Sequence, residues 1–215
     1  MIEAVIFDMD GVLVDSESLI RSAAMAMFAE HGLMVQSSDF VPFVGAGENR
    51  YIGGVAEKYG VRLDLPAAKA RTYALYLELV PRQLEMFPGA DTLVRQCKAS
   101  GLRVAVASSA DRIKIDANLD AIGLPWAEWD AIVSGEELVH LKPAPDIFLE
   151  AACRLGVPCA SCVVVEDAVN GVQAAKSANM RCVAVETSFS AGELGAADCI
   201  RARLDLVTLP DLLGE

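Results

Sequence analysis

The sequence lacks any apolar segment approaching the roughly 20 uninterrupted residues that a membrane-spanning helix needs. It also lacks the basic stretch followed by an apolar block that marks a secretory signal peptide, since Glu3, Asp8 and Asp10 come at once. We therefore expect a soluble protein with no direct insertion into a membrane.

Positive charge is scarce as well. The chain has 18 Lys and Arg residues against 30 Asp and Glu residues, a formal net charge of -12. Nucleic acid and anionic membrane surfaces repel such a protein, so neither is expected as a main partner. A small anionic substrate would need local positive charge, from a metal ion or from a well-placed lysine.

The six cysteines do not suggest a disulfide framework, because several stand in apolar surroundings, as buried thiols of a reducing intracellular compartment do. Cys159 and Cys162 form a CxxC pair, but it runs into a predicted strand instead of opening a helix, where a reactive thiolate would be stabilised. No second Cys pair or nearby His completes a zinc site. We expect the pair to be inert.

Apolar residues make up 53% of the 215-residue chain, enough for a large buried core. After a first apolar run at residues 3–8, four more alternate with amphipathic stretches. This alternation predicts an α/β fold, a parallel sheet with helices on both faces. The later runs lie at 102–107, 130–133, 162–166 and 181–185, and the amphipathic stretches near 89–100, 111–122, 145–155 and 168–179.

Residues 16–86 interrupt this series with helical patterns at 16–32, 48–59 and 66–80. Phe87, Pro88 and Gly89 then mark a turn or hinge. We therefore expect residues 1–15 and 87–215 to form one α/β core domain, and residues 16–86 to form an inserted helical subdomain.

Polar residues cluster just after the predicted strands, where ligands of parallel sheets bind. Carboxylates, hydroxyls and an ammonium group should therefore converge at one edge of the sheet. These residues are Asp8 and Asp10 after the first strand, Ser108 and Ser109 after the second, Lys142 after the third, and Glu166 and Asp167 after the fourth.

Carboxylates held together repel one another unless a cation joins them, and oxygen-rich sites of this kind suit Mg²⁺. A phosphate approaching Asp8 would meet a repulsion of about 4 kcal/mol per unit-charge pair at about 4 Å and an effective dielectric constant near 20. A metal held by Asp8, Asp10, Asp167 and Glu166, together with Lys142, would remove most of that barrier. Asp8 is then the candidate nucleophile and Asp10 the candidate acid and base, with Ser108, Ser109 and Lys142 as phosphate-binding groups.

At these residues the chain resembles the haloacid-dehalogenase-like superfamily of phosphohydrolases, and within it the β-phosphoglucomutase-like subgroup with a small helical cap. The four motifs that carry the resemblance occur in the family's order and spacing. They are Asp8 to Leu13, Val106 to Ser109, Lys142 to Phe148, and Val165 to Asp167 with Gly171. The resemblance implies a Rossmann-like, three-layer core, a mobile cap, Mg²⁺ and small phosphorylated metabolites as substrates.

Three functions stay open: a metabolite phosphatase, a phosphosugar mutase, and a regulatory module that keeps the fold inside a larger protein. Mutases of the resembled subgroup have a His five positions after the Asp that matches Asp15, where this chain has Ile20. They also have an Arg three positions after the glycine that matches Gly45, where this chain has Glu48. These differences favour the phosphatase, although Arg50 stands two residues further on.

The segment around Gly45 is expected to form a cap loop that faces the substrate, with Glu48, Asn49 and Arg50 as candidate contacts. Residues 39–43 and 107–114 resemble, more narrowly, the phosphatase-like domain of a multidomain plant and algal chloroplast protein that works in photoprotection. That resemblance implies that other domains of a longer chain are partners, and that the compartment is the chloroplast stroma instead of the cytoplasm.

Overall fold

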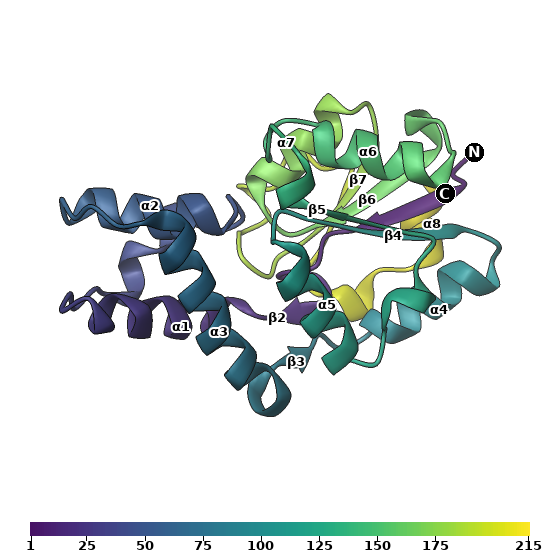
Figure 1. The fold of residues 1–215 in the computed structure, drawn as a ribbon. Coiled ribbons are helices and arrows are strands. Elements are labelled where there is room, and N and C mark those ends of the chain that lie inside the picture. Colours follow the sequence, from purple (N-terminus) through teal and green to yellow (C-terminus); the bar gives the residue numbers. More distant parts are fainter.

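The computed structural model describes residues 1–215, and its centre is a six-stranded parallel sheet (Figure 1). The strands lie in the order β5-β4-β1-β6-β7-β8. β1 is in the middle, paired with β4 on one side and β6 on the other, and all four of its residues are buried. The bounds are β1 Ala4–Phe7, β4 Arg103–Ser108, β5 Ala131–Ser134, β6 Cys162–Glu166, β7 Arg181–Val185 and β8 Cys199–Arg201.

Helices cover both faces of this sheet. Side chains of a strand alternate between its faces, so Val5 and Phe7 of β1 join one apolar cluster while Ala4 and Ile6 join the other. The first cluster contains residues of α4, α5 and α8, and the second contains residues of α6 and α7 (Figure 1). The predicted three-layer, Rossmann-like α/β class is confirmed. The helices are α4 Ala90–Ala99, α5 Arg112–Ala121, α6 Asp146–Leu155, α7 Val169–Ser177 and α8 Leu209–Leu213.

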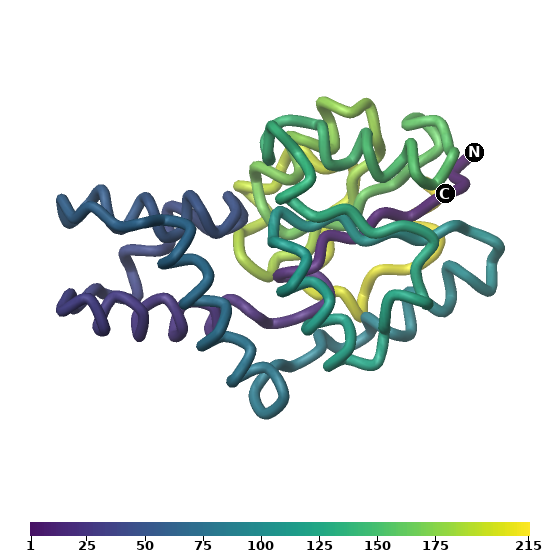
Figure 2. Tube along the Cα trace, viewed as in Figure 1, coloured from purple at the N-terminus to yellow at the C-terminus, as the bar shows by residue number.

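Three helices between the first two strands of the sheet pack on one another and form their own apolar cluster of 16 buried residues, from Leu19 to Val80. We call residues 17–83 the helical unit and the remainder the α/β unit. Figures 1 and 2 show the helical unit at one end of the molecule. It consists of α1 Glu17–Glu30, α2 Glu48–Lys58 and α3 Leu65–Gln83. As the sequence predicts, Pro66 lies in the first turn of α3, and the Asp64 side chain caps that turn by accepting from the backbone N–H of Ala67.

The chain passes between the two units twice, through short strands that pair with each other (Figure 2). β2 (Val14–Asp15) is antiparallel to β3 (Glu85–Met86), with Val14 opposite Met86. This pair was not predicted, and neither was β8, because two or three residues are too few to show a strand periodicity. Single turns of 3₁₀ helix occupy Ser37–Asp39, Val41–Phe43, Trp126–Glu128, Gly135–Glu137, Cys159–Ser161 and Leu204–Leu206.

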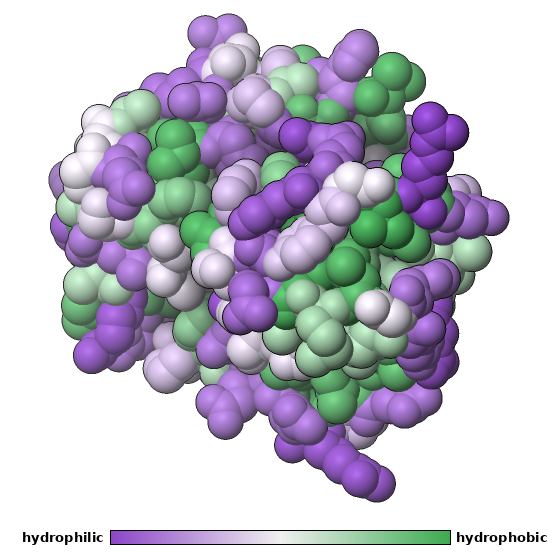
Figure 3. Space-filling model, turned by 90° about the vertical axis from the view of Figure 1, so that its left-hand side faces the viewer, coloured by the Kyte–Doolittle hydropathy of each residue, from purple (hydrophilic) through white to green (hydrophobic).

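Away from the α/β unit, the outer end of the helical unit exposes hydrophilic and apolar side chains side by side (Figure 3). Within the helical unit as a whole, Met34 and Val41 are the most exposed large apolar side chains. None of the helices is at once long enough and apolar enough to cross a membrane.

Helices α3 and α5 hold the two units together. The Tyr76 hydroxyl of α3 donates a 2.7 Å hydrogen bond to Asn118 Oδ1 of α5, and both residues are fully buried. At the other end of α5, the Lys69 ammonium lies 2.6 Å from Asp111 Oδ2. These contacts fix the position of α5, the helix that follows β4 at the edge where the strands end.

We expect Tyr76→Phe to lower the free energy of unfolding by about 1–3 kcal/mol, because it leaves the buried Asn118 oxygen without a donor. Arg71→Met is the control: it removes an exposed ion pair with Glu30 within the helical unit, which typically contributes less than about 1 kcal/mol. Urea unfolding followed by circular dichroism measures both. Equal stabilities for Tyr76→Phe and the unmodified protein would show that this hydrogen bond contributes nothing.

Candidate active site

A pocket lies between the carboxyl ends of the central strands and the helical unit. Its walls come from the segments after β1, β4 and β6 and from the first turns of α1 and α2. All seven residues predicted at the strand ends line it. The lining residues are Asp8, Asp10, Gly11, Glu17, Ile20, Phe43, Val44, Gly45, Gly47, Glu48, Tyr51, Ser108, Ser109, Ala110, Lys114, Lys142, Glu166, Asp167, Ala168, Asn170 and Ser188.

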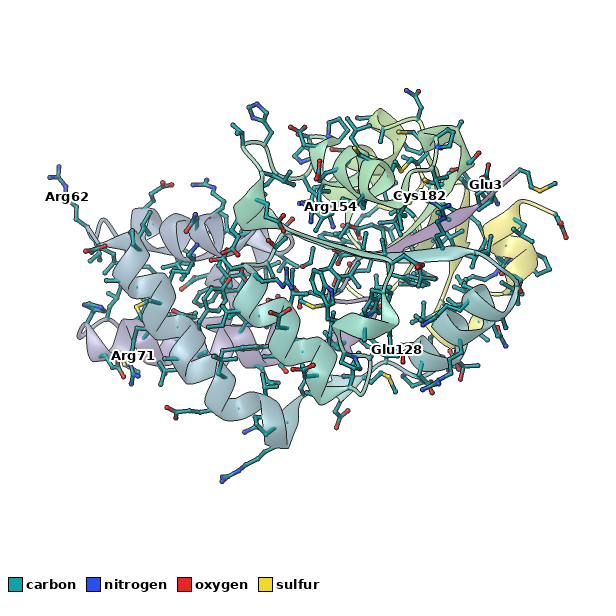
Figure 4. All side chains as sticks on the ribbon, turned by 45° about the vertical axis from the view of Figure 1, so that its right-hand side comes forward. Glu3, Arg62, Arg71, Glu128, Arg154 and Cys182 are labelled. Carbon is teal, nitrogen blue, oxygen red and sulfur yellow. The ribbon has the colours of Figure 1, made fainter.

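Charge in this pocket is unbalanced: six carboxylates and two ammonium groups, those of Lys114 and Lys142, face it. Arg21 lies 3.3 Å from Glu17, one of the six carboxylates, but does not itself line the pocket, and Arg62 projects outward from the helical unit (Figure 4). An anionic substrate therefore meets a surplus of negative charge unless a further cation is bound.

Asp8 follows β1 directly, and its backbone N–H donates to the Val165 carbonyl at 2.9 Å, which extends the pairing of β1 with β6. The loop after it turns at Gly11, whose φ is 82°. A Cβ at this glycine would lie 1.9 Å from Asp167 Oδ2. The absence of a side chain at Gly11 is therefore what allows the first loop to approach Asp167.

Lys142 joins two of the carboxylates. Its Nζ lies 2.5 Å from Asp8 Oδ1 and 2.7 Å from Glu166 Oε1, and its side chain is only 3% exposed. The other oxygen of Glu166 accepts from the backbone N–H groups of Asp167 and Ala168, each at 2.7 Å. Glu166 is thus held at both oxygens, and it in turn holds the ammonium group beside Asp8.

Asp8, Glu166 and Asp167 form a buried group whose carboxylate oxygens lie within 4.8 Å of one another. Burial raises the pKa of Asp8 to about 7, although Lys142 opposes the shift. Burial also raises the pKa of Asp167 well above its usual range, and the negative charges of Glu166 and Asp8 add to this. A divalent cation would stabilise the ionised forms of Asp8 and Asp167, whose pKa values are raised, so these residues fit an oxygen-coordinated metal.

Asp10 lines the same pocket, but its side chain is not a member of that acidic group. Its Oδ2 accepts a 2.8 Å bond from the Lys114 ammonium, and its Oδ1 accepts from the Ser16 hydroxyl. The two residues Asp8 and Asp10 therefore face different partners: Asp8 faces the acidic group and Lys142, and Asp10 faces Ser16 and Lys114.

Ser108 and Ser109 are both buried at the end of β4. The Ser108 hydroxyl accepts from the backbone N–H of Ala110 at 3.2 Å, which leaves its own proton free to be donated. The Ser109 hydroxyl has no partner at all, although it is buried in the pocket wall. Both are available as donors to an anion.

The four candidate residues of the helical unit separate into two pairs. Gly45 and Glu48 line the pocket, whereas Asn49 and Arg50 are exposed and do not. Successive residues of a helix point about 100° apart, so the residues after Glu48 at the start of α2 turn away from the pocket. Arg50 instead lies 2.8 Å from Glu57 and stacks on Phe43. Ile20 also lines the pocket.

Sequence reasoning missed five polar residues of the pocket. The spacing of Glu48 and Tyr51, three residues apart on a predicted helix, could have placed Tyr51; the other four had no comparable signal. Ser188 donates to Asp167 at 2.5 Å, Asn170 donates to the Gly45 carbonyl at 3.2 Å, and Tyr51 donates to Glu17 at 2.8 Å. The five are Glu17, Tyr51, Lys114, Asn170 and Ser188.

The CxxC pair lies outside the pocket, with Cys159 in a single 3₁₀ turn and Cys162 at the start of β6. Burial raises the pKa of the Cys162 thiol to about 11, and the neighbouring Cys159 adds a smaller shift in the same direction. Reactive cysteines show the opposite shift.

The sequence and the fold match those of known proteins. A family model described as a haloacid dehalogenase-like hydrolase matches residues 2–179, a range that includes all four motifs. The solved structure of CbbY from Rhodobacter sphaeroides in complex with phosphate superimposes with a TM-score of 0.89 at 28% identity, covering 99% of each chain.

Two curated proteins show the same likeness along the chain. Protein SUPPRESSOR OF QUENCHING 1, chloroplastic, of Arabidopsis thaliana is 52% identical over 99% of the chain, but the chain covers only 21% of that protein's length. Hexitol phosphatase B of Escherichia coli strain K12 is 31% identical, with 98% of the chain and 96% of the relative covered.

We expect Gly171→Ala to destabilise the fold by about 1–3 kcal/mol, the usual effect of overpacking. A Cβ at this position in α7 would lie 1.7 Å from Glu166 Oε1, an oxygen fixed by Lys142. Gly53→Ala is the matched control, because its Cβ would make an ordinary 3.6 Å contact with Leu65 and should stabilise α2 by up to about 1 kcal/mol. Urea unfolding distinguishes them, and equal stability of the two variants would contradict the steric argument.

Proposed function

The chain belongs to the haloacid dehalogenase-like hydrolase family and is an enzyme that hydrolyses phosphate esters, and we propose that it is a Mg²⁺-dependent phosphatase. Its proposed substrate is a small phosphorylated metabolite, and the proposed reaction passes through an aspartyl-phosphate on Asp8. One observation carries the proposal. The Asp8 carboxylate lies against the buried Lys142 ammonium at the carboxyl ends of β1, β4 and β6, with Asp10 in the same pocket.

In the first step an oxygen of the Asp8 carboxylate attacks phosphorus, and the bond between phosphorus and the leaving alcohol oxygen breaks. Asp10, protonated at that moment, gives its proton to the leaving oxygen. In the second step Asp10 takes a proton from a water molecule as that water attacks the same phosphorus. The bond between phosphorus and the Asp8 oxygen breaks, inorganic phosphate leaves, and Asp8 is restored as a carboxylate.

The other groups of the pocket have roles in binding the phosphoryl group. Ser108 and Ser109 present hydroxyl protons that have no acceptor within the protein, and Lys142 supplies a positive charge. Preorganised donors of this kind stabilise the charge that develops on the equatorial oxygens. They also explain how an acidic protein binds an anion.

Mg²⁺ would be held by Asp8 and Asp167, with Glu166 close enough to act directly or through water. When bound, the ion would supply positive charge that offsets the excess negative charge of the six carboxylates of the pocket. The sequence also predicts Asp10 as a ligand. Its side chain faces Ser16 and Lys114 instead, so its participation stays a prediction.

We expect the protein to hydrolyse 4-nitrophenyl phosphate in the presence of Mg²⁺ and to stop in EDTA. Asp8→Asn should abolish turnover, because the amide removes the nucleophile with almost no change in volume, while the circular dichroism spectrum stays unchanged. Trapping a phosphorylated protein by rapid acid quench tests the intermediate directly. Turnover of Asp8→Asn at the rate of the unmodified enzyme would exclude an aspartyl-phosphate on this residue.

A phosphosugar mutase is the second candidate, and the pocket opposes it. Both positions at which the subgroup's mutases carry a His and an Arg line the pocket here, as Ile20 and Glu48. Ile20 has no hydrogen-bonding group to offer the catalytic acid, and Glu48 would repel a distal phosphate. Arg50, which could have replaced the missing Arg, is exposed and paired with Glu57. The name of the hexitol phosphatase, which is matched over 96% of its length, also supports a phosphatase.

Incubation with β-glucose 1-phosphate and a catalytic amount of the 1,6-bisphosphate distinguishes the two reactions. We expect inorganic phosphate to be released without accumulation of glucose 6-phosphate, because nothing in the pocket holds a bisphosphate through a reorientation. Phosphate release and hexose phosphate isomers are measured by a colorimetric assay and by ³¹P NMR. Rapid isomerisation with little release of phosphate would identify a mutase.

The likeness to the Arabidopsis protein supports two further parts of the proposal. The name of that relative places it in the chloroplast, and the chain covers 21% of its length. We therefore propose that the chain works in the chloroplast stroma, beside other domains of a longer protein, with the cytoplasm as the alternative. A purely regulatory domain would have no use for an intact set of Asp8, Asp10, Ser108, Lys142 and Asp167, so we favour catalysis.

A further inference from the structure

Lys114 is a buried cation of the pocket that the proposed reaction does not yet use. It lies in the first turn of α5, and its side chain is 3% exposed. Its Nζ lies 2.8 Å from Asp10 Oδ2 and 3.2 Å from Glu48 Oε1. Asp10 belongs to the α/β unit and Glu48 to the helical unit, so the ammonium group bridges the two units inside the pocket.

Glu48 depends on this contact. Its other oxygen, Oε2, is buried and has no hydrogen-bond partner in the protein. A buried carboxylate with a single ionic partner binds that partner strongly, since the loss of the partner would leave an uncompensated charge. Lys114 is therefore anchored from the helical unit while it holds Asp10.

The two oxygens of Asp10 are both engaged, from opposite partners. Lys114 donates to Oδ2, and Ser16 donates to Oδ1. An ammonium group has only donors, whereas a hydroxyl can also accept. Lys114 therefore always binds Oδ2 as a donor, and together with Ser16 at Oδ1 it fixes the plane of the Asp10 carboxyl group.

We propose that Lys114 is a positioning residue that sets the orientation of the Asp10 carboxyl group for proton transfer, an inference that rests on the proposed phosphatase reaction. Through Lys114, this orientation also depends on Glu48 of the helical unit. Asp10 can then act as an acid only when α2 lies against the α/β unit. A displacement of about 1 Å in a catalytic group can reduce a rate by about 10²-fold, so the effect is measurable.

The test compares two substrates for each variant. An alkyl phosphate, chosen from a panel of sugar and polyol phosphates, needs protonation of its leaving oxygen, whereas 4-nitrophenyl phosphate has a leaving group that needs little. Lys114→Met keeps the length of the side chain and removes its charge. We expect kcat/KM for the alkyl phosphate to fall by about 10²-fold, with little change in kcat/KM for the aryl phosphate. This ratio reports the step that releases the alcohol, whereas kcat also includes hydrolysis of the aspartyl-phosphate, which uses Asp10 for both substrates.

The same substitution in an Asp10→Asn background separates positioning from other effects. If Lys114 acts through Asp10, Lys114→Met should cause almost no further loss of kcat once Asp10 is Asn. Additive losses would overturn the proposal, because they would mean that Lys114 acts on the substrate independently. Lys114→Arg keeps the charge and should recover most of the rate on the alkyl phosphate.

Lys69→Met is the matched control. Lys69 also bridges the helical unit to α5, through Asp111, but it lies outside the pocket. Its loss should change kcat/KM by the same factor for the two substrates, if at all. An equal fall in kcat/KM for both substrates with Lys114→Met would show that Lys114 merely holds the units together, which would overturn the proposal.

Glu48→Gln covers the case in which Lys114→Met does not fold, as judged by circular dichroism and thermal melting. It keeps Lys114 but weakens its anchor, so it should lower kcat/KM for the alkyl phosphate more than for the aryl phosphate. No difference between the substrates would overturn the proposal. An unmodified enzyme that hydrolyses neither phosphate would contradict the proposed function itself, and that outcome is recognised before any variant is compared.

Discussion

Repulsion among carboxylates at the carboxyl edge of the sheet is the constraint on which the rest of the site depends. Asp8, Glu166 and Asp167 are buried within 4.8 Å of one another, and burial raises the pKa of Asp8 to about 7. Lys142 offsets part of this charge by lying between Asp8 and Glu166. The surrounding backbone holds this cluster together, because two N–H groups bind Glu166. Gly11 leaves the space that Asp167 occupies, and Gly171 leaves the space that Glu166 occupies. The site is thus preorganised for a cation and an anion together.

The two lysines of the pocket follow the same rule at different levels of the structure. Each ammonium group is buried and shared between two carboxylates that come from different parts of the chain. Lys142 connects the loop after β1 to the last residue of β6 within the α/β unit. Lys114 connects that unit to the helical unit through Glu48. A buried lysine is stable only with such partners, so the position of the helical unit and the charge balance of the pocket are determined together.

The sequence predicted the parts of the fold and site that depend on local pattern and on topology. Apolar runs located five of the six strands of the sheet, and the rule that ligands bind at strand ends brought Asp8, Ser108, Lys142 and Asp167 to one pocket. Lys114 could not be predicted in this way. Beside Arg112 and Asp116 it resembles a solvent-facing residue of an amphipathic helix, and it becomes buried only because α2 and α3, far away in the sequence, pack over it. The directions of Asn49 and Arg50 depended on how α2 is rotated about its own axis against the α/β unit, which the helical pattern at 48–59 does not specify.

The pairing of β2 with β3 has a consequence for how such proteins diversify. The helical unit leaves and rejoins the α/β unit through two adjacent strands, with Val14 opposite Met86 and Asp15 opposite Glu85. Any inserted segment whose ends meet at that separation can be accommodated without a change in the strand order of the sheet. Gene recombination at these two junctions would therefore exchange the whole insertion as one segment, and the exchanged segment would keep the hydrolytic chemistry only where it again supplied a carboxylate to Lys114, as Glu48 does here.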